Sequence, residues 1–262
     1  MKIDLKKVSG LPVAVESVTG EFILGEGLNT PSIRVRMMHD LDGVWANPVT
    51  GADKMIYQYT SGLWFKEDEV SWKQANIIYG IVVFLPGIFS GEFNKSSGQY
   101  HPIVPPNTKA TPEIYTVLHG TGHFILQKSS PPYDVIEDAV LVEVQEGESF
   151  IVPPDYGHLQ INCGTGPLIF SYVVMDGMQG VYDPFRQKKG AIYYEMAPGT
   201  QGGRFVANNN YDQYLPLRII KAGEISQLPS FDRLITYQHV LANLRHLKFL
   251  TDPAKFPASA GI

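Results

Sequence analysis

Short apolar runs rich in Val, Ile, Tyr and Phe dominate the middle of this chain. They cover residues 55–58, 76–84, 113–118, 123–127, 138–144, 149–152 and 168–175. Gly and Pro interrupt the runs, for example at Gly120-Thr121-Gly122 and Gly164-Thr165-Gly166. Residues of the first group favour strands, and Gly and Pro favour the turns between them. The pattern predicts an all-β fold built around a closed antiparallel barrel, whose mouth is a typical place for one small ligand.

The C-terminal part of the chain has a different pattern. Its apolar residues recur near helical spacing and stop before Pro253; they are Leu234, Ile235, Val240, Leu241, Leu244 and Leu247. This predicts an amphipathic helix with Ser230 or Asp232 as its N-cap. We therefore expect a barrel with N-terminal strands over 1–212, and a helical extension over 213–262 that packs on the barrel or on a partner subunit.

Composition narrows the classes of function. The net charge of −5 comes without a basic cluster, which argues against a nucleic-acid partner because phosphate neutralisation requires Lys and Arg. We expect no membrane partner, because the chain has no apolar run long enough to span a bilayer and no signal-peptide pattern. A single cysteine allows no internal disulfide and fits a reducing cytoplasm. Neither a P-loop nor a dinucleotide-binding glycine motif is present.

Four side chains with oxygen or nitrogen donors form a candidate metal site. Gln99 and His101 alternate, so they point to the same face of a strand. Glu113 lies on an otherwise apolar strand, where burial without a partner would be costly, and His158 follows a proline turn. Such donors suit a first-row divalent ion such as Fe, Mn, Ni, Co or Zn. For Gln99 two roles stay open, a direct ligand or a hydrogen-bonding neighbour of bound water.

The spacing of these residues resembles the two motifs of the cupin superfamily. The first motif is carried by Gln99, His101, Glu113 and Gly120, and the second by Gly147, Pro153, His158 and Asn162. In the second motif only Asp155 departs, since the family usually has glycine there. The resemblance implies a cupin double-stranded β-helix, or jelly-roll barrel, here with an N-terminal β extension and a C-terminal helical extension.

A closer resemblance is to the cupin-type glucose-6-phosphate isomerases, over about Leu11 to Asn209. It rests on segments such as Phe84-Leu85-Pro86-Gly87, Gly91-Glu92-Phe93 and Val152-Pro153-Pro154. The family's metal set is His, His, Glu and His, and the matching positions hold Gln99, His101, Glu113 and His158. Gln99 departs, because its amide oxygen is a weaker ligand than an imidazole. The resemblance also implies a homodimer.

The family's substrate-binding positions are matched in part. For phosphate the resemblance implies Ser96 and Gly98, with Val82 in place of a threonine and Lys95 as a possible replacement charge. For the sugar it implies Tyr115 and Tyr182. Two further positions depart, a tyrosine replaced by Val174 and a histidine replaced by Gly180. With no arginine clamp expected, the phosphate would rest mainly on hydroxyl and backbone N–H donors.

These features imply a metal-dependent isomerase that interconverts glucose 6-phosphate and fructose 6-phosphate. Glu113 would move the proton, and Tyr115 and Tyr182 would hold substrate hydroxyls. Two alternatives stay open. One is a noncatalytic binder of sugars or sugar phosphates, and the other is a metal-dependent cupin oxygenase, since one fold hosts many functions.

Overall fold

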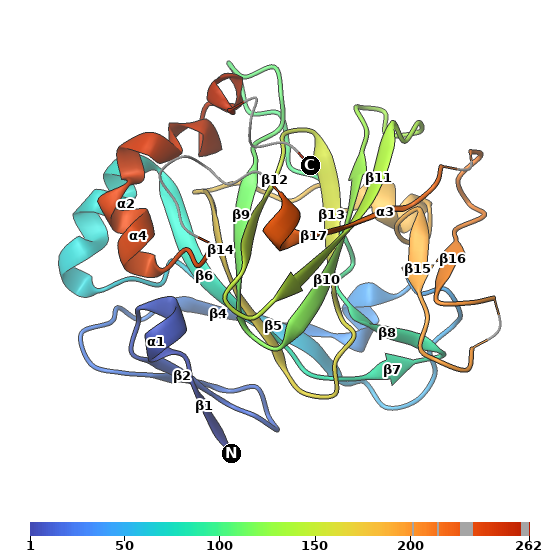
Figure 1. The fold of residues 1–262 in the computed structure, drawn as a ribbon, viewed down its shortest axis with the longest axis horizontal. Coiled ribbons are helices and arrows are strands. Elements are labelled where there is room, and N and C mark those ends of the chain that lie inside the picture. The colour runs from blue at the N-terminus through green and yellow to red at the C-terminus, as the bar shows by residue number, and fades with distance from the viewer. Residues whose placement is uncertain (201, 214, 226–232, 258–261) are drawn as a thin grey trace.

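Two six-stranded sheets face each other in the computed structural model, which describes residues 1–200, 202–213, 215–225, 233–257 and 262 (Figure 1). The first sheet has the order β17 (Arg218–Lys221), β11 (Asp138–Gln145), β10 (Thr121–Lys128), β13 (Tyr156–Asn162), β8 (Glu92–Lys95) and β7 (Ile88–Phe89). The second has the order β12 (Ser149–Val152), β9 (Glu113–His119), β14 (Leu168–Met175), β6 (Ile77–Phe84), β5 (Met55–Ser61) and β4 (Ser32–Met37). Within the described chain the neighbouring strands are antiparallel, except that β17 runs parallel to β11. The predicted all-β cupin barrel is confirmed.

The central strands are continuous apolar runs in the sequence because their side chains alternate between two faces that are both buried. In β10, Phe124 and Leu126 pack between the two sheets, whereas Ile125 packs in a separate cluster outside them. In β14, Phe170 and Tyr172 face inward and Val173 faces outward. Both faces of these strands are covered, so neither face needs polar residues.

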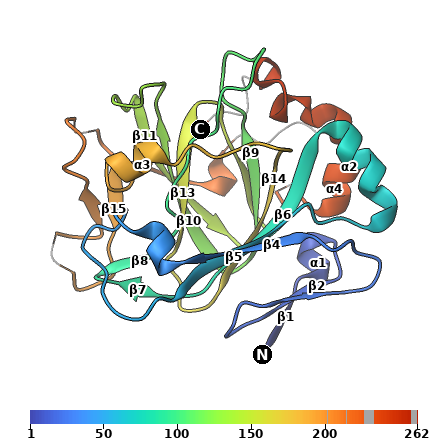
Figure 2. The same ribbon diagram turned by 180° about the vertical axis from the view of Figure 1, so that it is seen from behind.

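Layers on both sides cover the barrel. A three-stranded sheet of β1 (Lys2–Asp4), β2 (Val13–Glu16) and β3 (Phe22–Leu24) forms the predicted N-terminal extension. In both ribbon views, α2 (Glu69–Ala75) and α4 (Tyr237–Ala242) lie at one side of the barrel, and α3 (Asp183–Gln187), β15 (Tyr193–Glu195) and β16 (Phe205–Ala207) lie at the other (Figures 1 and 2). The remaining short helices are α1 (Lys6–Ser9) and the 3₁₀ segments Met38–Leu41, Lys66–Asp68, Ala222–Glu224, Leu244–Leu250 and Pro253–Lys255.

The predicted C-terminal helical extension is confirmed, but it consists of several short segments rather than one helix. It contributes β17 to the barrel sheet, and its α-helix is confined to Tyr237–Ala242. Thr236 is the N-cap and accepts a hydrogen bond from the His239 N–H at 3.3 Å; the predicted caps Ser230 and Asp232 lie outside the described residues. The helix ends at Asn243, whose side chain donates to the His239 carbonyl at 2.8 Å and so competes with the helical pattern.

The extension packs against the barrel through an aromatic contact. Tyr237 is fully buried, and its hydroxyl accepts a hydrogen bond from Trp72 Nε1 at 2.9 Å. Its ring also meets Tyr79 of β6 edge to face. The extension therefore covers the outer face of the second sheet, while the division of the chain at residue 212 stays a prediction.

Two strands that frame the site have polar patterns and were absent from the apolar runs. In β13 the polar residues His158, Gln160 and Asn162 alternate with Leu159 and Ile161. The apolar pair packs in the outer cluster, so the polar set faces the barrel interior. β4 likewise alternates Arg34 and Arg36 with exposed Ile33 and Val35.

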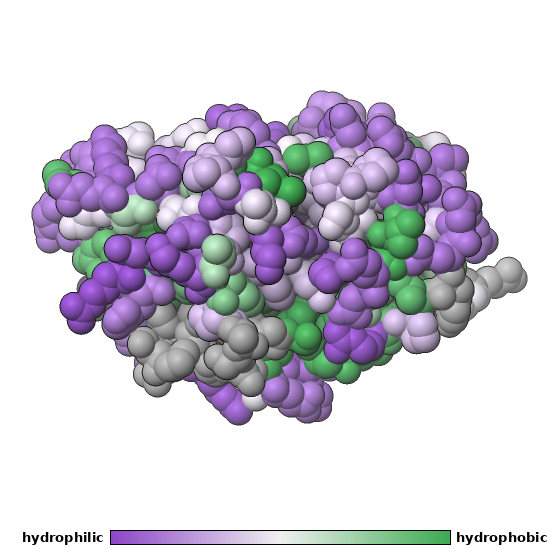
Figure 3. Space-filling model, turned by 90° about the horizontal axis from the view of Figure 1, so that it is seen from above, coloured by the Kyte–Doolittle hydropathy of each residue, from purple (hydrophilic) through white to green (hydrophobic). Residues whose placement is uncertain are grey.

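None of the helices in the described part of the chain is both long and apolar enough to cross a bilayer. On the face seen from above, hydrophobic residues form separate patches among polar ones (Figure 3).

Candidate metal centre and ligand cavity

Three predicted metal ligands meet inside the barrel. Glu113 begins β9, His158 lies on β13, and His101 follows the segment of Gln99 that pairs with His158. His101 Nε2 lies 3.2 Å from Glu113 Oε2, and His158 Nε2 lies 3.3 Å from the same atom. All three side chains are buried, and one donor atom from each lies within 4.8 Å of the others. The trio could hold a metal ion.

The protonation of this trio fits a cation. The Thr111 carbonyl accepts a hydrogen bond from His101 Nδ1 at 2.7 Å, so Nε2 is the ring nitrogen that faces Glu113. Burial lowers the pKa of His158, so its imidazole is neutral near pH 7. Burial acts to raise the pKa of Glu113, but His101 and His158 outweigh it and bring that pKa to about 2.

Two buried Nε2 atoms therefore face one carboxylate without making a hydrogen bond to it. Unpaired buried polar atoms are costly, and a divalent cation between them would satisfy all three donors. Oxygen and nitrogen donors of this kind suit the first-row metals named above.

Gln99 lies beside the trio. Its backbone N–H and carbonyl pair with His158 at 3.0 and 2.9 Å, so the two side chains leave the same face of neighbouring strands. The amide oxygen of Gln99 occupies the space that a Cβ on Gly180 would fill. Whether Gln99 contacts a metal directly stays a prediction.

Glu113 connects the trio to a cavity of about 360 Å³, within the usual range for small-ligand sites. Gln99, Tyr115, Ser96, Gly98 and Tyr182 also line this cavity, so it gathers the predicted substrate-binding residues. His101 and His158 are not in its lining. They would lie behind Glu113 as seen from a bound ligand.

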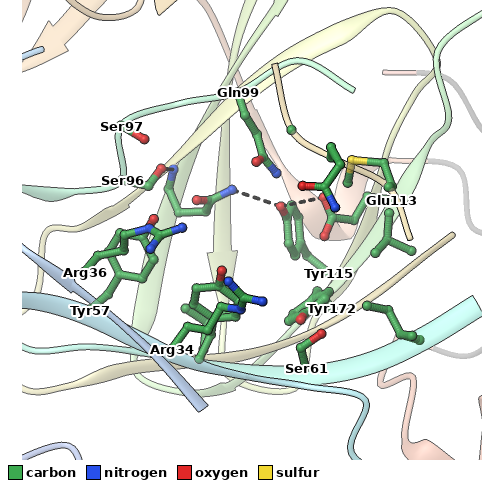
Figure 4. Close-up of a pocket in the computed structure, with 18 of the residues that line it drawn as sticks. Arg34, Arg36, Tyr57, Ser61, Ser96, Ser97, Gln99, Glu113, Tyr115 and Tyr172 are labelled. Atoms are coloured by element: carbon green, nitrogen blue, oxygen red, sulfur yellow. Dashed lines mark hydrogen bonds between the residues drawn. The ribbon is translucent and has the colours of Figure 1, made fainter. Parts of the chain in front are cut away.

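A chain of hydrogen bonds crosses the cavity (Figure 4). The Tyr115 hydroxyl donates to Glu113 Oε2 at 2.8 Å and accepts from Gln160 Nε2 at 2.9 Å. The backbone N–H of Gln160 donates to Ser96 Oγ at 3.2 Å. Burial raises the pKa of Tyr115, and the Glu113 charge raises it further, so the phenol stays protonated as a donor.

Two arginines line the cavity, contrary to the expectation that no arginine clamp would be present. Arg34 and Arg36 alternate on β4, opposite Tyr59 and Tyr57 of β5. The Arg36 guanidinium lies 5.8 Å from the centre of the Tyr59 ring. Figure 4 draws both arginines across the cavity from Gln99 and Glu113. The signal in the sequence was the alternation Arg34-Val35-Arg36, which places both charges on one face.

The prediction that Lys95 could supply a charge for phosphate was wrong. Lys95 pairs across the sheet with Ile161, which faces the outer layer rather than the cavity. Its ammonium group is buried, forms an ion pair with Glu92, and donates to the Val44 carbonyl at 2.6 Å. Alternation along β8 turns it away from the ligand.

The remaining predicted positions have distinct surroundings. Gly98 has φ +76°, and a Cβ there would overlap the Phe185 ring, so glycine is required on backbone grounds alone. Tyr182 lies just before α3 with Arg36 as a hydrogen-bond partner. Val82 and Val174 both line the cavity and make that part of its wall apolar.

The fold and the site define a cupin with a buried trio that could hold a metal ion. The family model described as glucose-6-phosphate isomerase (GPI) matches residues 35–214, and the chain belongs to this family. A curated relative, glucose-6-phosphate isomerase from Thermococcus litoralis, is 27% identical over 142 residues, which cover 52% of this chain and 66% of that protein.

Solved structures of an oxalate decarboxylase are also similar. The Bacillus subtilis enzyme at pH 4.6 aligns with a TM-score of 0.32 and 21% identity over 46% of this chain and 25% of that chain. A second structure, concerned with its substrate binding mode and a reaction specificity switch, aligns with a TM-score of 0.33 and 20% identity over 50% of this chain and 28% of that chain. Matches this distant say nothing about activity.

Proposed function

We propose that this protein is a metal-dependent aldose–ketose isomerase that interconverts glucose 6-phosphate and fructose 6-phosphate. The observation that carries the proposal is the position of Glu113, which touches both the buried histidines and the ligand cavity. A cation site thus adjoins a cavity that carries two arginines. This pairing suits a substrate with a reactive carbonyl at one end and a phosphate at the other.

The metal-binding role goes to His101, Glu113 and His158, with the Gln99 amide oxygen as the fourth donor. Fe, Mn, Ni, Co and Zn all fit these ligand types. When bound, such an ion supplies Lewis-acid stabilisation for negative charge that develops on the sugar oxygens during proton transfer.

We assign the role of proton-transferring group to the Glu113 carboxylate. Its contacts with Tyr115, His101 and His158 all involve Oε2. We assign Oε1 to the substrate, where it would take the proton from C2 of the aldose and leave an enediolate. After the hydroxyl proton passes from O2 to O1, Oε1 would return its proton to C1, giving the ketose. The Tyr115 hydroxyl keeps the carboxylate oriented and holds a substrate hydroxyl, as does Tyr182.

We assign phosphate binding to polar residues at the rim of the cavity. Ser96 supplies a hydroxyl and Gly98 a close backbone approach, as the sequence implied. Arg34 and Arg36 add the cationic donors that were not expected, and arginine is well suited to phosphate because its planar group can donate two parallel hydrogen bonds. We also infer a homodimer in the cytoplasm, without nucleic-acid or membrane partners.

The experiment combines elemental analysis of purified protein with a coupled assay of both hexose phosphates. Glu113→Gln and His158→Ala should abolish turnover, with His158→Ala also losing metal. His119→Ala is the matched control, because His119 is partly exposed and pairs with Glu146 away from the trio. Bound metal without turnover on any hexose phosphate would contradict the isomerase. That result would favour the noncatalytic binder, which the apolar replacements Val82 and Val174 support, or the oxygenase.

A further inference from the structure

A second cluster of reactive side chains lies on the outer face of the barrel, away from the cavity. His123 belongs to β10, Glu195 to β15, and Cys163 directly follows β13. One donor atom from each of the three lies within 4.8 Å of the others. His123 is buried opposite Ile161, whose side chain packs in the outer layer. Neither the proposed isomerase chemistry nor the cavity uses these residues.

Buried charges fix the histidine in one orientation. His123 Nδ1 lies 2.8 and 2.9 Å from the two oxygens of Glu195, which is fully buried. Arg204 donates to Glu195 Oε1 through Nη2 at 2.8 Å and Nε at 3.0 Å. With Nδ1 held by the carboxylate, Nε2 is the nitrogen left for a further partner. Glu143 on the adjacent strand is also near, 3.9 Å from Nε2.

The same contacts favour the charged imidazolium. Burial acts to lower the pKa of His123, but hydrogen bonds to Cys163 and Glu195 outweigh burial and raise it to about 9. The charged and titratable groups that face it are Glu195, Cys163, Glu143 and Arg204. Besides Glu195, the acidic or thiol groups near the ring are Cys163 and Glu143.

We propose that Cys163, His123 and Glu195 form a peroxide-reactive thiol site on the outer face of the barrel. Cys163 is partly exposed, so a small oxidant can reach its sulfur. The thiolate is the reactive form of cysteine, and a neighbouring imidazolium stabilises it. Glu195 and Arg204 act as positioning residues that hold the ring of His123.

The reaction requires only these residues and one molecule of hydroperoxide. The sulfur attacks one peroxide oxygen, so an S–O bond forms as the O–O bond breaks. The electron pair of the O–O bond leaves on the distal oxygen, which takes a proton from His123 and departs as water or an alcohol. Sulfur is oxidised to the sulfenic acid and the peroxide is reduced.

A metal ion is the competing occupant of this trio, and the charges disfavour it. The guanidinium of Arg204 already binds Glu195 and lies 3.4 Å from His123 Nδ1. A divalent cation placed there would be repelled by that positive charge at short range. The thiol reaction does not require Arg204 to move away from Glu195.

The test measures how fast iodoacetamide and hydrogen peroxide consume the thiol of the folded protein. Cys163 is the chain's only cysteine, so the readout is unambiguous, and Cys163→Ser gives the blank. An imidazolium partner favours the thiolate, which is the reactive form of cysteine. Wild type should therefore react about tenfold faster than His123→Asn at about pH 6. The control His119→Asn, at a partly exposed histidine that pairs with Glu146, should stay near wild type.

Equal rates for wild type and His123→Asn would overturn the proposal. So would labelling that rises with a chelator and falls with added Zn²⁺, since that identifies a metal site. If His123→Asn does not fold, the ultraviolet thiolate absorbance of wild type minus Cys163→Ser decides instead. A thiolate signal already present well below the ordinary cysteine pKa of about 8.5 supports the pair, and a single titration near about pH 8.5 contradicts it.

Discussion

The amide oxygen of Gln99 fills the space that a side chain on Gly180 would need. Cupin-type glucose-6-phosphate isomerases, as the resemblance implies, carry histidine at both of these positions. The two departures, 81 positions apart in the sequence, are therefore neighbours in the cavity wall of this protein. Glycine at position 180 makes room for the conformation that Gln99 adopts, so we expect the two positions to be coupled.

This contact predicts a graded effect on metal binding. Gln99→Ala removes a neutral amide and should weaken metal affinity by about 10-fold, at the lower end of the 10–100-fold typical for groups that support a metal site. His158→Ala removes an imidazole and should weaken affinity by more than that range. Isothermal titration with Zn²⁺ or Mn²⁺ measures both. Equal losses for the two variants would make Gln99 as strong a ligand as His158, and no loss for Gln99→Ala would remove Gln99 from the metal site.

Gly180→Ala provides the complementary test. A Cβ at this position forces the Gln99 amide to move, so this variant should reproduce the affinity loss of Gln99→Ala. In the double variant Gly180→Ala/Gln99→Ala the second change should add little, because the residues are in contact and their effects are not additive. Fully additive losses would mean that the two residues act separately.

Metal removal should destabilise the protein. A ligand present at about 100 times its dissociation constant stabilises a fold by about 2.7 kcal/mol, so chelation should lower the thermal midpoint measurably. His101 Nε2 and His158 Nε2 are then left buried without partners. His158→Ala should show a smaller response to chelator than wild type, and His119→Ala should respond as wild type does.

The pH at which metal is lost follows from His158. Burial lowers its pKa below the ordinary 6.5, so protons compete with a metal only at more acidic pH than for an exposed histidine. We expect the metal to stay bound at about pH 6 and to be released on further acidification. Release that begins above pH 6.5 in a dialysis series would contradict the lowered pKa of the folded protein.

The arginines predict a selective effect on phosphorylated ligands. A hydrogen bond to a charged group contributes about 1.5–3 kcal/mol, so Arg36→Gln should raise the KM for hexose phosphates by roughly 10–100-fold. Binding of an unphosphorylated hexose should change little. Arg218→Gln is the control, since Arg218 pairs with Asp138 away from the cavity. An equal loss for both kinds of sugar would assign Arg36 a structural role.

The Tyr115→Phe variant distinguishes the packing role of the Tyr115 ring from the catalytic role of its hydroxyl. The ring, which packs on Phe124 and Phe150, is retained, while the hydrogen bonds to Glu113 and from Gln160 are lost. Stability should fall by about 1–3 kcal/mol, because Gln160 loses a buried partner. We expect kcat to fall more than KM rises, since the hydroxyl orients the proton-transferring carboxylate. Unchanged kcat, with the stability loss alone, would limit Tyr115 to a structural role.

Local sequence patterns predicted much of this protein's structure. Apolar runs punctuated by Gly and Pro fixed the barrel strands almost to the residue, as for Ser149–Val152 and Leu168–Met175. The spacing of His101, Glu113 and His158 matched the cupin motifs, and the structure brings one donor atom from each within 4.8 Å of the others. These are properties of short segments, and a sequence displays them directly.

Only the tertiary structure decided which polar residues face the ligand. Lys95 precedes Ser96 in the chain, yet strand alternation and the pairing with Ile161 send it into the outer layer against Glu92. Arg34 and Arg36 lie far from the motifs in sequence, and the placement of β4 beside β5 brings them to the cavity. The contacts of Gln99 with Gly180 and of His123 with Glu195 likewise join distant segments. Such contacts depend on how whole strands and loops are arranged in space, which local periodicity does not encode.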